Sequence, residues 1–115
     1  PGASAFLTAI VASGIAADKF AFFGFPPHKK GRKTFLQKIA ELDITAVLYE
    51  SPYRIHKLLD ELSEMVAAER KICLARELTK IYEEYIRGSI EEVKEKINNK
   101  SNLKGEFVVI LEGKK

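Results

Sequence analysis

The sequence lacks the short motifs that most often identify a ligand-binding or catalytic domain. It contains no GxGxxG pattern and no Gly-Lys-Ser phosphate-binding loop, so the common nucleotide-binding folds are not indicated. His28 and His56 are isolated, and no set of histidines and cysteines has the spacing of metal ligands. No local signature of a Ser-His-acid triad occurs either. These absences argue against the nucleotide-binding, metal-binding and hydrolase classes.

Cysteine and long apolar runs are also scarce. The single Cys73 lies inside a strand-like run, which predicts a buried thiol and neither a disulfide nor a metal ligand. The longest mainly apolar stretch, residues 3–17, is too short and too interrupted to span a bilayer, and no basic segment precedes it. We therefore expect a cytoplasmic protein that neither binds a metal nor enters a membrane.

What is present indicates one globular domain. The 115 residues are 46% hydrophobic and 30% charged, which is typical of a folded domain of ordinary size and predicts a single domain over residues 1–115. The chain begins with Pro-Gly and not with Met, so we expect it to be a piece of a longer protein. The net charge of +3 is too small to indicate nucleic acid binding by itself.

The positive charge is concentrated in one segment, residues 28–33, which we call the basic loop. It carries four formal positive charges in six residues, on Lys29, Lys30, Arg32 and Lys33, with no acidic residue between them. Such a segment is most often a solvated turn. Because it follows an aromatic run and a Pro-Pro turn, it can also present its charges to RNA phosphates on an ordered base.

The periodicity predicts alternating helices and strands. Helices are expected within residues 3–13, 35–42, 52–66 and 89–97, and strands within 20–25, 44–49, 71–75, 82–86 and 105–111. Ser51 is expected to cap the helix within residues 52–66, and Ser89-Ile-Glu-Glu92 is typical of a capping box. We predict an α/β fold with a mixed sheet of about five strands and about four helices on both its faces; the strand order stays open.

Two strand-like runs end in clusters of charged side chains. The first ends in Glu50-Ser-Pro-Tyr-Arg54 and the second in Arg76-Glu-Leu-Thr-Lys80. Each can be an ordinary strand end followed by a polar loop. Because ligands of open α/β sheets bind beyond the carboxyl ends of strands, the repeated pairing of Glu with Arg also predicts one side of a binding cleft, where a helix N-terminus can offer N–H donors to an anion.

Five blocks of sequence follow one another along the chain: residues 1–5 (PGASA), 22–29 (FFGFPPHK), 49–54 (YESPYR), 75–80 (ARELTK) and 104–113 (KGEFVVILEG). Taken together, these blocks resemble the C-terminal half of the tetrapyrrole methylase superfamily, and most closely its branch of small-subunit ribosomal RNA cytidine 2′-O-methyltransferases. The departures from the family pattern are small: Ala3 replaces a usual Pro, Pro26 a usual Leu, and Tyr53 a common His.

The resemblance implies a two-domain enzyme, often a homodimer, that transfers a methyl group from S-adenosylmethionine to a ribose hydroxyl of small-subunit ribosomal RNA. It implies a fold of the tetrapyrrole methylase C-terminal domain, with the cofactor held between this domain and an N-terminal one. By this analogy, Arg54 and Lys80 face the reacting nucleotide. The cofactor wall would comprise Leu48, Tyr49, Glu50, Arg76, Glu77 and Leu78, and the RNA contacts would be Lys29, Lys30, Arg32 and Lys33.

Two other functions stay open at this point. An enzyme of the same fold could methylate a tetrapyrrole or another small acceptor, although such relatives generally lack a basic loop at this position. Alternatively, the chain could be an RNA-binding module without catalysis.

Overall fold

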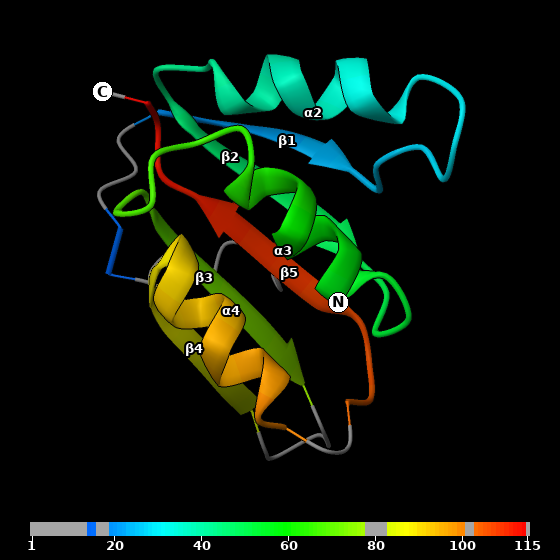
Figure 1. Ribbon diagram of the computed structural model, residues 1–115, viewed down its shortest axis with the longest axis vertical. Helices are drawn as coiled ribbons and strands as arrows, with labels where there is room; N and C mark the ends of the chain where they lie inside the picture. Colours follow the sequence, from blue (N-terminus) through cyan, green and yellow to red (C-terminus); the bar gives the residue numbers. More distant parts are fainter. Residues whose placement is uncertain (1–13, 16–18, 78–82, 101–102, 115) are drawn as a thin grey trace.

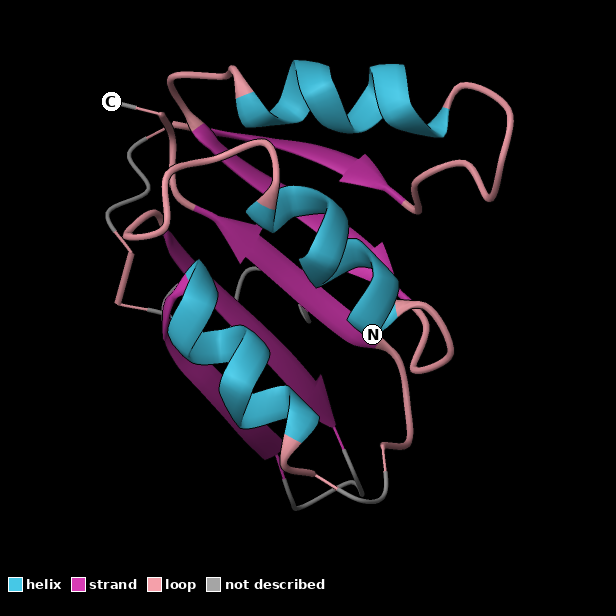
Figure 2. Cartoon of the chain, viewed as in Figure 1, coloured by secondary structure: helices cyan, strands magenta, loops and turns pink. Residues whose placement is uncertain are grey.

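The fold is a single mixed β-sheet with helices packed on one of its faces (Figures 1 and 2). The computed structural model describes residues 14–15, 19–77, 83–100 and 103–114. The elements in chain order are β1 (Phe20–Gly24), α2 (Arg32–Ala40), β2 (Thr45–Glu50), α3 (Ile55–Ser63), β3 (Lys71–Glu77), β4 (Glu83–Ser89), α4 (Ile90–Asn98) and β5 (Phe107–Leu111).

The five strands lie in the order β1-β2-β5-β3-β4. β1 and β2 are parallel, whereas β5 pairs antiparallel with both β2 and β3, and β4 pairs antiparallel with β3. Since β2 and β3 both run opposite to β5, they run in the same direction, and their carboxyl ends lie at the same edge of the sheet. The strand order, which the periodicity left open, therefore brings the two charged strand ends together.

The main core lies between the sheet and the three described helices. Each helix contributes one apolar stripe: α3, for example, buries Ile55, Leu58, Leu59 and Leu62. These side chains pack against strand residues that point to the same face, including Leu48, Leu74 and Val109. Burying a side chain of this size contributes about 1.5–3 kcal/mol, so the packing of the described helices on the sheet is a large source of stability.

A second, smaller cluster lies on the opposite face of the sheet. It is formed by Val47, Cys73, Ala75 and Ile110, with Ile15 packed on it. Alternate residues of the central strands thus belong to different clusters, which explains why β2 and β5 are apolar without alternation. The Cys73 thiol is buried and free, as expected, and burial raises its pKa to about 11.

The mixed α/β sheet expected from the sequence is confirmed, with five strands close to their expected positions. Three of the four expected helices are present, and all three cover the same face of the sheet. The fourth helix, expected within residues 3–13, lies outside the described residues. The prediction that helices cover both faces of the sheet therefore stays a prediction. In the described part of the chain, no helix is long and apolar enough to cross a lipid bilayer.

The start of α3 differs from the expectation. Ser51 does not cap this helix, because residues 51–54 form a separate turn closed by the Arg54 N–H, which donates to the Ser51 carbonyl at 3.1 Å. The helix begins at Ile55, with Arg54 as its N-cap and no side-chain cap. The capping box at α4 is confirmed: the Ser89 hydroxyl accepts from the Glu92 N–H, and the Glu92 carboxylate accepts from the Ser89 N–H.

Candidate functional site

Charged side chains form a row across the sheet edge where β2 and β3 end. In the sheet register, Glu50 of β2 and Arg76 of β3 both lie opposite Phe107 of β5, and Arg76 lies opposite Glu84 of β4. Phe107 is fully buried between the two strand ends. The two segments that the sequence predicted to share a site are therefore neighbours, separated by a single strand.

Glu50 is the centre of a buried ion-pair network. Its carboxylate is 1% exposed, and both oxygens are occupied. Oε1 accepts from the Ser51 N–H at 3.0 Å and from Arg54 Nε at 3.2 Å, while Oε2 accepts from Arg32 Nη2 at 3.2 Å. The carboxylate thus holds the turn after β2 in place, and its oxygens are engaged within the chain instead of being presented to a ligand.

Arg32 belongs to this network and not to the exposed surface of the basic loop. Its side chain is 3% exposed, and it donates to the Glu61 carboxylate at 2.9 Å and to the Pro27 carbonyl at 3.0 Å in addition to Glu50. Burial alone would lower the pKa of the guanidinium, but the hydrogen bonds and charges of Glu61 and Glu50 raise it above its ordinary value. A guanidinium enclosed in this way is not available to RNA phosphates, so the sequence-based assignment of Arg32 to the RNA contacts needs correction.

Arg76 is likewise engaged in internal interactions. Its side chain is 6% exposed; Nε donates to Glu84 at 2.8 Å and Nη1 to the Lys104 carbonyl at 3.1 Å. The guanidinium carbon lies 5.6 Å from the centre of the Phe107 ring, a cation–π distance. Glu84 is shared with Lys100, and although burial alone would raise the pKa of Glu84, these two cations lower it.

The remaining residues predicted for the cofactor wall fall into different environments. The Leu48 side chain is fully buried in the core, so only its backbone could face a ligand. Tyr49 is half-buried, with its ring 5.1 Å from that of Phe22. Glu77 is the last residue of β3, while Leu78 and Lys80 lie outside the described residues.

One polar group at the site was missed by sequence reasoning. The Ser51 hydroxyl is buried and, among the described residues, has no hydrogen-bond partner. A buried hydroxyl without a partner costs about 1–3 kcal/mol relative to a satisfied one, so this position at a strand end is favourable for a polar ligand group. Ser51 follows the strand directly in the sequence, which is a signal for a ligand site, but the sequence analysis interpreted Ser51 as a helix cap.

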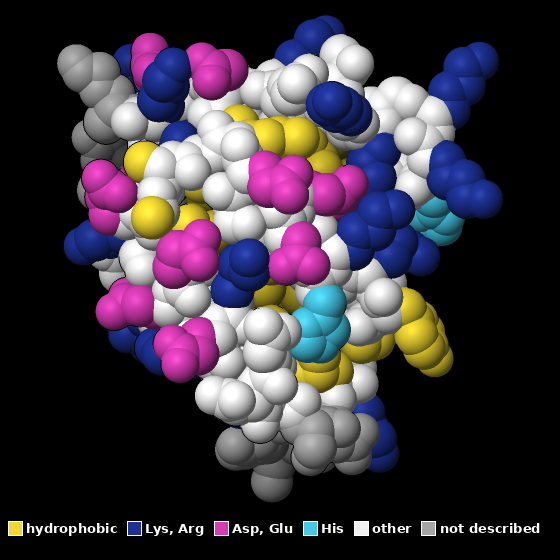
Figure 3. All heavy atoms as spheres, in the orientation of Figure 1, with side chains coloured by type: hydrophobic (Ala, Val, Ile, Leu, Met, Phe, Trp, Pro, Cys, Tyr) yellow, Lys and Arg dark blue, Asp and Glu magenta, His cyan; other side chains and the backbone are white. Residues whose placement is uncertain are grey.

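The lysines of the basic loop remain at the surface. Lys29, Lys30 and Lys33 are exposed, and none of them forms a salt bridge with a described acidic residue within 4 Å. The predicted catalytic Arg54 lies in the next connection, with 28% of its side chain exposed. Figure 3 shows Lys and Arg side chains gathered at the right of the molecule, over the loop leading into α2 and the start of α3.

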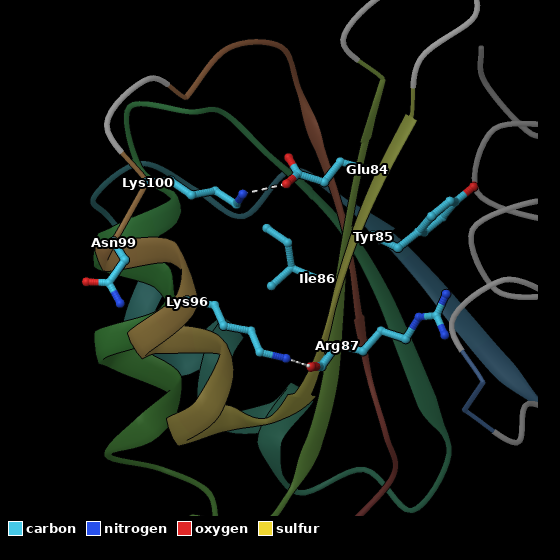
Figure 4. Close-up of a pocket in the computed structure, with 7 residues that line it drawn as sticks. All are labelled: Glu84, Tyr85, Ile86, Arg87, Lys96, Asn99 and Lys100. Carbon is cyan, nitrogen blue, oxygen red and sulfur yellow. Dashed lines mark hydrogen bonds and ion pairs between the residues drawn. The ribbon is translucent and has the colours of Figure 1, made fainter.

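A hollow of about 420 Å³ lies elsewhere, between β4 and α4. Figure 4 shows Lys96 and Lys100 reaching across it toward β4. Both ammonium groups are occupied, Lys96 by the Arg87 carbonyl at 2.7 Å and Lys100 by the Glu84 carboxylate. Both lysines that reach across this hollow are therefore engaged within the chain.

The chain matches a known protein family over the residues that form the strand-end site. The family model for tetrapyrrole (corrin/porphyrin) methylases matches residues 1–94, which include β1 to β4 and the whole Glu50 network. The chain belongs to this family. Its β2 and β3 ends, with their shared edge of the sheet, are thus features of a tetrapyrrole methylase domain.

Curated relatives of this methylase chain cover almost all of it. The ribosomal RNA small subunit methyltransferase I of Haemophilus influenzae is 46% identical over 99% of the chain and 41% of its own length. The protein of the same name from Bacillus subtilis is 42% identical over 98% of the chain and 38% of its own length. The chain therefore spans about two fifths of the length of these relatives.

Solved structures of methyltransferases share the fold. The methyltransferase CobJ superposes with a TM-score of 0.69 at 19% identity, over 94% of this chain and 47% of its own. The cobalt-precorrin-4 methyltransferase CbiF superposes with a TM-score of 0.68 at 16% identity, over 98% of this chain and 50% of its own. At such low identity these likenesses establish the fold of the methylase domain and not its substrate.

Proposed function

We propose that this chain is the C-terminal domain of an S-adenosylmethionine-dependent methyltransferase that methylates the ribose 2′-hydroxyl of a cytidine in small-subunit ribosomal RNA. The observation that carries the proposal is the match of nearly the whole chain, at 40–46% identity, to relatives named ribosomal RNA small subunit methyltransferase I. The three exposed lysines of the basic loop support an acceptor that carries phosphates.

The proposed role of the strand-end edge is to form one wall of the cofactor cleft. When bound, S-adenosylmethionine supplies an electrophilic methyl group for an in-line displacement, a reaction that depends chiefly on the positioning of donor and acceptor. Ser51 fits such a ligand, because at the edge where β2 and β3 end it offers a buried hydroxyl that no described group bonds. Glu50 and Arg76 act by holding these strand ends in place.

The proposed role of the exposed cations is to hold the RNA. Lys29, Lys30 and Lys33 neutralise phosphates, while Arg54, tethered to Glu50 at 3.2 Å, faces the reacting nucleotide together with Lys80. A ribose hydroxyl is a weak nucleophile, so a cation or base near it assists its attack. The hydrogen bond from Arg54 to Glu50 fixes the position of the Arg54 side chain before RNA binds.

A methyl-transfer assay with the full-length protein tests the substrate. We expect transfer of labelled methyl groups from S-adenosylmethionine to small ribosomal subunits, at a ribose 2′-hydroxyl of cytidine, and none to a porphyrin precursor. Labelling of the porphyrin precursor alone would replace the proposal by a tetrapyrrole methyltransferase. RNA binding without transfer to either acceptor would favour a module without catalysis.

The salt dependence of RNA binding tests the three lysines. In the triple variant Lys29→Ala, Lys30→Ala, Lys33→Ala, the slope of log affinity against log salt should fall by roughly 0.7–0.9 for each phosphate that is no longer neutralised. The matched control replaces Lys38, Lys71 and Lys114, three exposed lysines away from the strand-end site, and should keep the slope. Equal slopes for the two triple variants would contradict a phosphate-binding role of the basic loop.

We also propose that the full-length protein is a homodimer, as the family resemblance implies. Light scattering at micromolar concentration should give twice the mass of one chain. A monomeric mass over the working concentration range would remove this part of the proposal.

A further inference from the structure

Tyr53 is the most exposed large hydrophobic side chain among the described residues. It is 92% exposed, compared with 50% for Phe25, the next in the series. A single exposed apolar side chain is common on protein surfaces, and exposure alone indicates no function. Tyr53 is distinguished by the way in which the chain holds it and by the groups that surround it.

The turn that carries Tyr53 is fixed on both sides by one buried carboxylate. Glu50 accepts from the Ser51 N–H before Tyr53 and from Arg54 Nε after it, and the Arg54 N–H closes the turn on the Ser51 carbonyl. The backbone of the turn is therefore ordered by internal hydrogen bonds before any ligand binds. An aromatic side chain on such a turn loses little conformational entropy on binding, since it has only two side-chain torsions.

The same carboxylate connects the turn to the basic loop. Arg32 donates to Glu50 through Nη2 and to the Pro27 carbonyl through Nη1, so one buried guanidinium joins the entrance of the loop to the end of β2. β1 and β2 are parallel neighbours, and the connections that follow them leave the same edge of the sheet (Figure 1). The exposed ring thus lies on the same side of the domain as the three exposed lysines, next to Arg54.

An exposed aromatic ring beside several cations matches the chemistry of single-stranded nucleic acid. Lysines attract the phosphate backbone without regard to sequence, and unpaired bases stack on aromatic side chains, whereas the base faces inside a duplex are covered by their neighbours. We propose that Tyr53 stacks on an unpaired nucleobase, and that the surface formed by the basic loop and the 51–54 turn binds single-stranded RNA in preference to a duplex. This inference rests on the proposed RNA substrate and specifies its form.

Phe25, the other exposed aromatic residue near the basic loop, is in a different situation. Its ring lies 5.4 Å from that of Tyr49 in a tilted arrangement, so part of its surface is already packed within the chain. Replacing it would disturb this aromatic pair as well as any RNA contact. Tyr53 can be replaced without such an effect, because surface substitutions usually change stability by less than about 0.5 kcal/mol.

Two variants of Tyr53 in the full-length protein test the inference. Tyr53→Leu keeps an apolar side chain of moderate size but cannot stack, whereas Tyr53→Phe keeps the ring and loses only the hydroxyl. The probes are a single-stranded RNA of about ten nucleotides carrying one 2-aminopurine and the duplex of the same sequence. Loss of one base–aromatic stack corresponds to about 1–3 kcal/mol, or roughly a 5- to 150-fold weaker affinity.

The expected result is a loss of affinity for single-stranded RNA alone. Tyr53→Leu should bind the single strand at least about 5-fold more weakly, with unchanged duplex affinity, an unchanged salt slope and less quenching of 2-aminopurine, while Tyr53→Phe should behave like the original protein. Equal affinity of Tyr53→Leu and the original protein for the single strand would overturn the inference. An equal loss for single strand and duplex would also overturn it, because a duplex offers no free base face.

The lysine triple variant separates this inference from the proposed function. If that variant loses RNA affinity while Tyr53→Leu does not, RNA binding stands and only the stacking role fails. If neither variant changes the affinity for RNA, the proposed RNA surface fails as a whole, and the stacking role with it.

Discussion

At the scale of single residues, the environment decides which polar groups are available for ligands. Ser51 and Arg32 both differ from what their positions in the sequence suggest: the hydroxyl has no partner among the described residues, whereas the guanidinium is enclosed by three acceptors. The sequence identifies both as polar groups near a strand end or a basic run. It does not show which of them is already satisfied by other parts of the chain, because Glu61 lies 29 positions from Arg32.

Replacing Ser51 by alanine should weaken cofactor binding without lowering the stability of the fold. Removing a buried hydroxyl that is not hydrogen-bonded by the described residues should leave the free energy of unfolding unchanged or raise it by about 1 kcal/mol. If the hydroxyl bonds the cofactor, affinity for S-adenosylhomocysteine should fall roughly 2- to 12-fold, the equivalent of one hydrogen bond. Urea denaturation and titration calorimetry on the full-length protein measure the two effects.

Ser63→Ala is the matched control for this experiment. The Ser63 hydroxyl donates to the Asp60 carbonyl at 2.8 Å within α3, away from the strand ends, so its removal should leave cofactor affinity unchanged. A Ser51→Ala variant with the same cofactor affinity as Ser63→Ala would show that the hydroxyl does not face the ligand.

At the scale of secondary-structure elements, the Glu50 network links three separate parts of the chain. Arg32 at the start of α2 pairs with Glu50 at the end of β2 and with Glu61 in α3. Buried ion pairs add little net stability compared with apolar packing, but removing one partner leaves an uncompensated charge. The network therefore fixes the relative positions of the basic loop and the 51–54 turn more than it stabilises the domain.

Glu50→Gln should destabilise the protein by about 3 kcal/mol, since it removes one of the two carboxylates that compensate the buried Arg32 charge. Urea denaturation should give a clearly lower midpoint. The control is Glu41→Gln, because Glu41 pairs with Lys114 at the surface, where both side chains are more than half exposed, and exposed pairs contribute little. Similar midpoints for the two variants would show that removing the Glu50 carboxylate does not leave an uncompensated buried charge on Arg32.

The elements themselves were largely predictable from local patterns. Continuous apolar runs located β2 and β5, and the Ser89–Glu92 spacing located the start of α4. The start of α3 was not predictable in this way, because Ser51-Pro52 satisfies the sequence rule for a helix N-terminus. In the structure, the Glu50 carboxylate binds the Ser51 and Arg54 donors and favours a separate turn over an earlier helix start.

At the scale of the whole molecule, carboxylates paired with cations make stability depend on pH. The pKa values of three glutamates are lowered. Lys114 lowers the pKa of Glu41, and the Ser89 backbone N–H lowers that of Glu92. Burial alone would raise the pKa of Glu84, but Lys100 and Arg76 lower it. A carboxylate with a lowered pKa in the folded state binds fewer protons there than in the unfolded chain. Stability from these groups is therefore fully present above the ordinary glutamate pKa and is lost as the pH falls through their lowered native pKa values.

We expect the urea midpoint to be highest near neutral pH and to fall as the pH drops below about 4.5, through the native pKa values of these groups. Denaturation at several pH values between 7 and 3 measures the effect. Glu84→Gln should make the urea midpoint depend less steeply on pH, because Glu84 is the one partly buried carboxylate among these three glutamates. A midpoint independent of pH over this range would contradict the assigned ion pairs.

Most elements, the buried Cys73 and the two charged strand ends were predictable from the sequence, because apolar periodicity, capping residues and strand boundaries are local properties. The folded structure was needed to show that these strand ends lie on either side of Phe107 and that Arg32 is buried with Glu50 and Glu61. Strand order and long-range ion pairs depend on which distant segments pack together, and that choice is made by the whole core. For the same reason, the exposed ring of Tyr53 and the buried hydroxyl of Ser51 could be distinguished only after the turn between β2 and α3 was known.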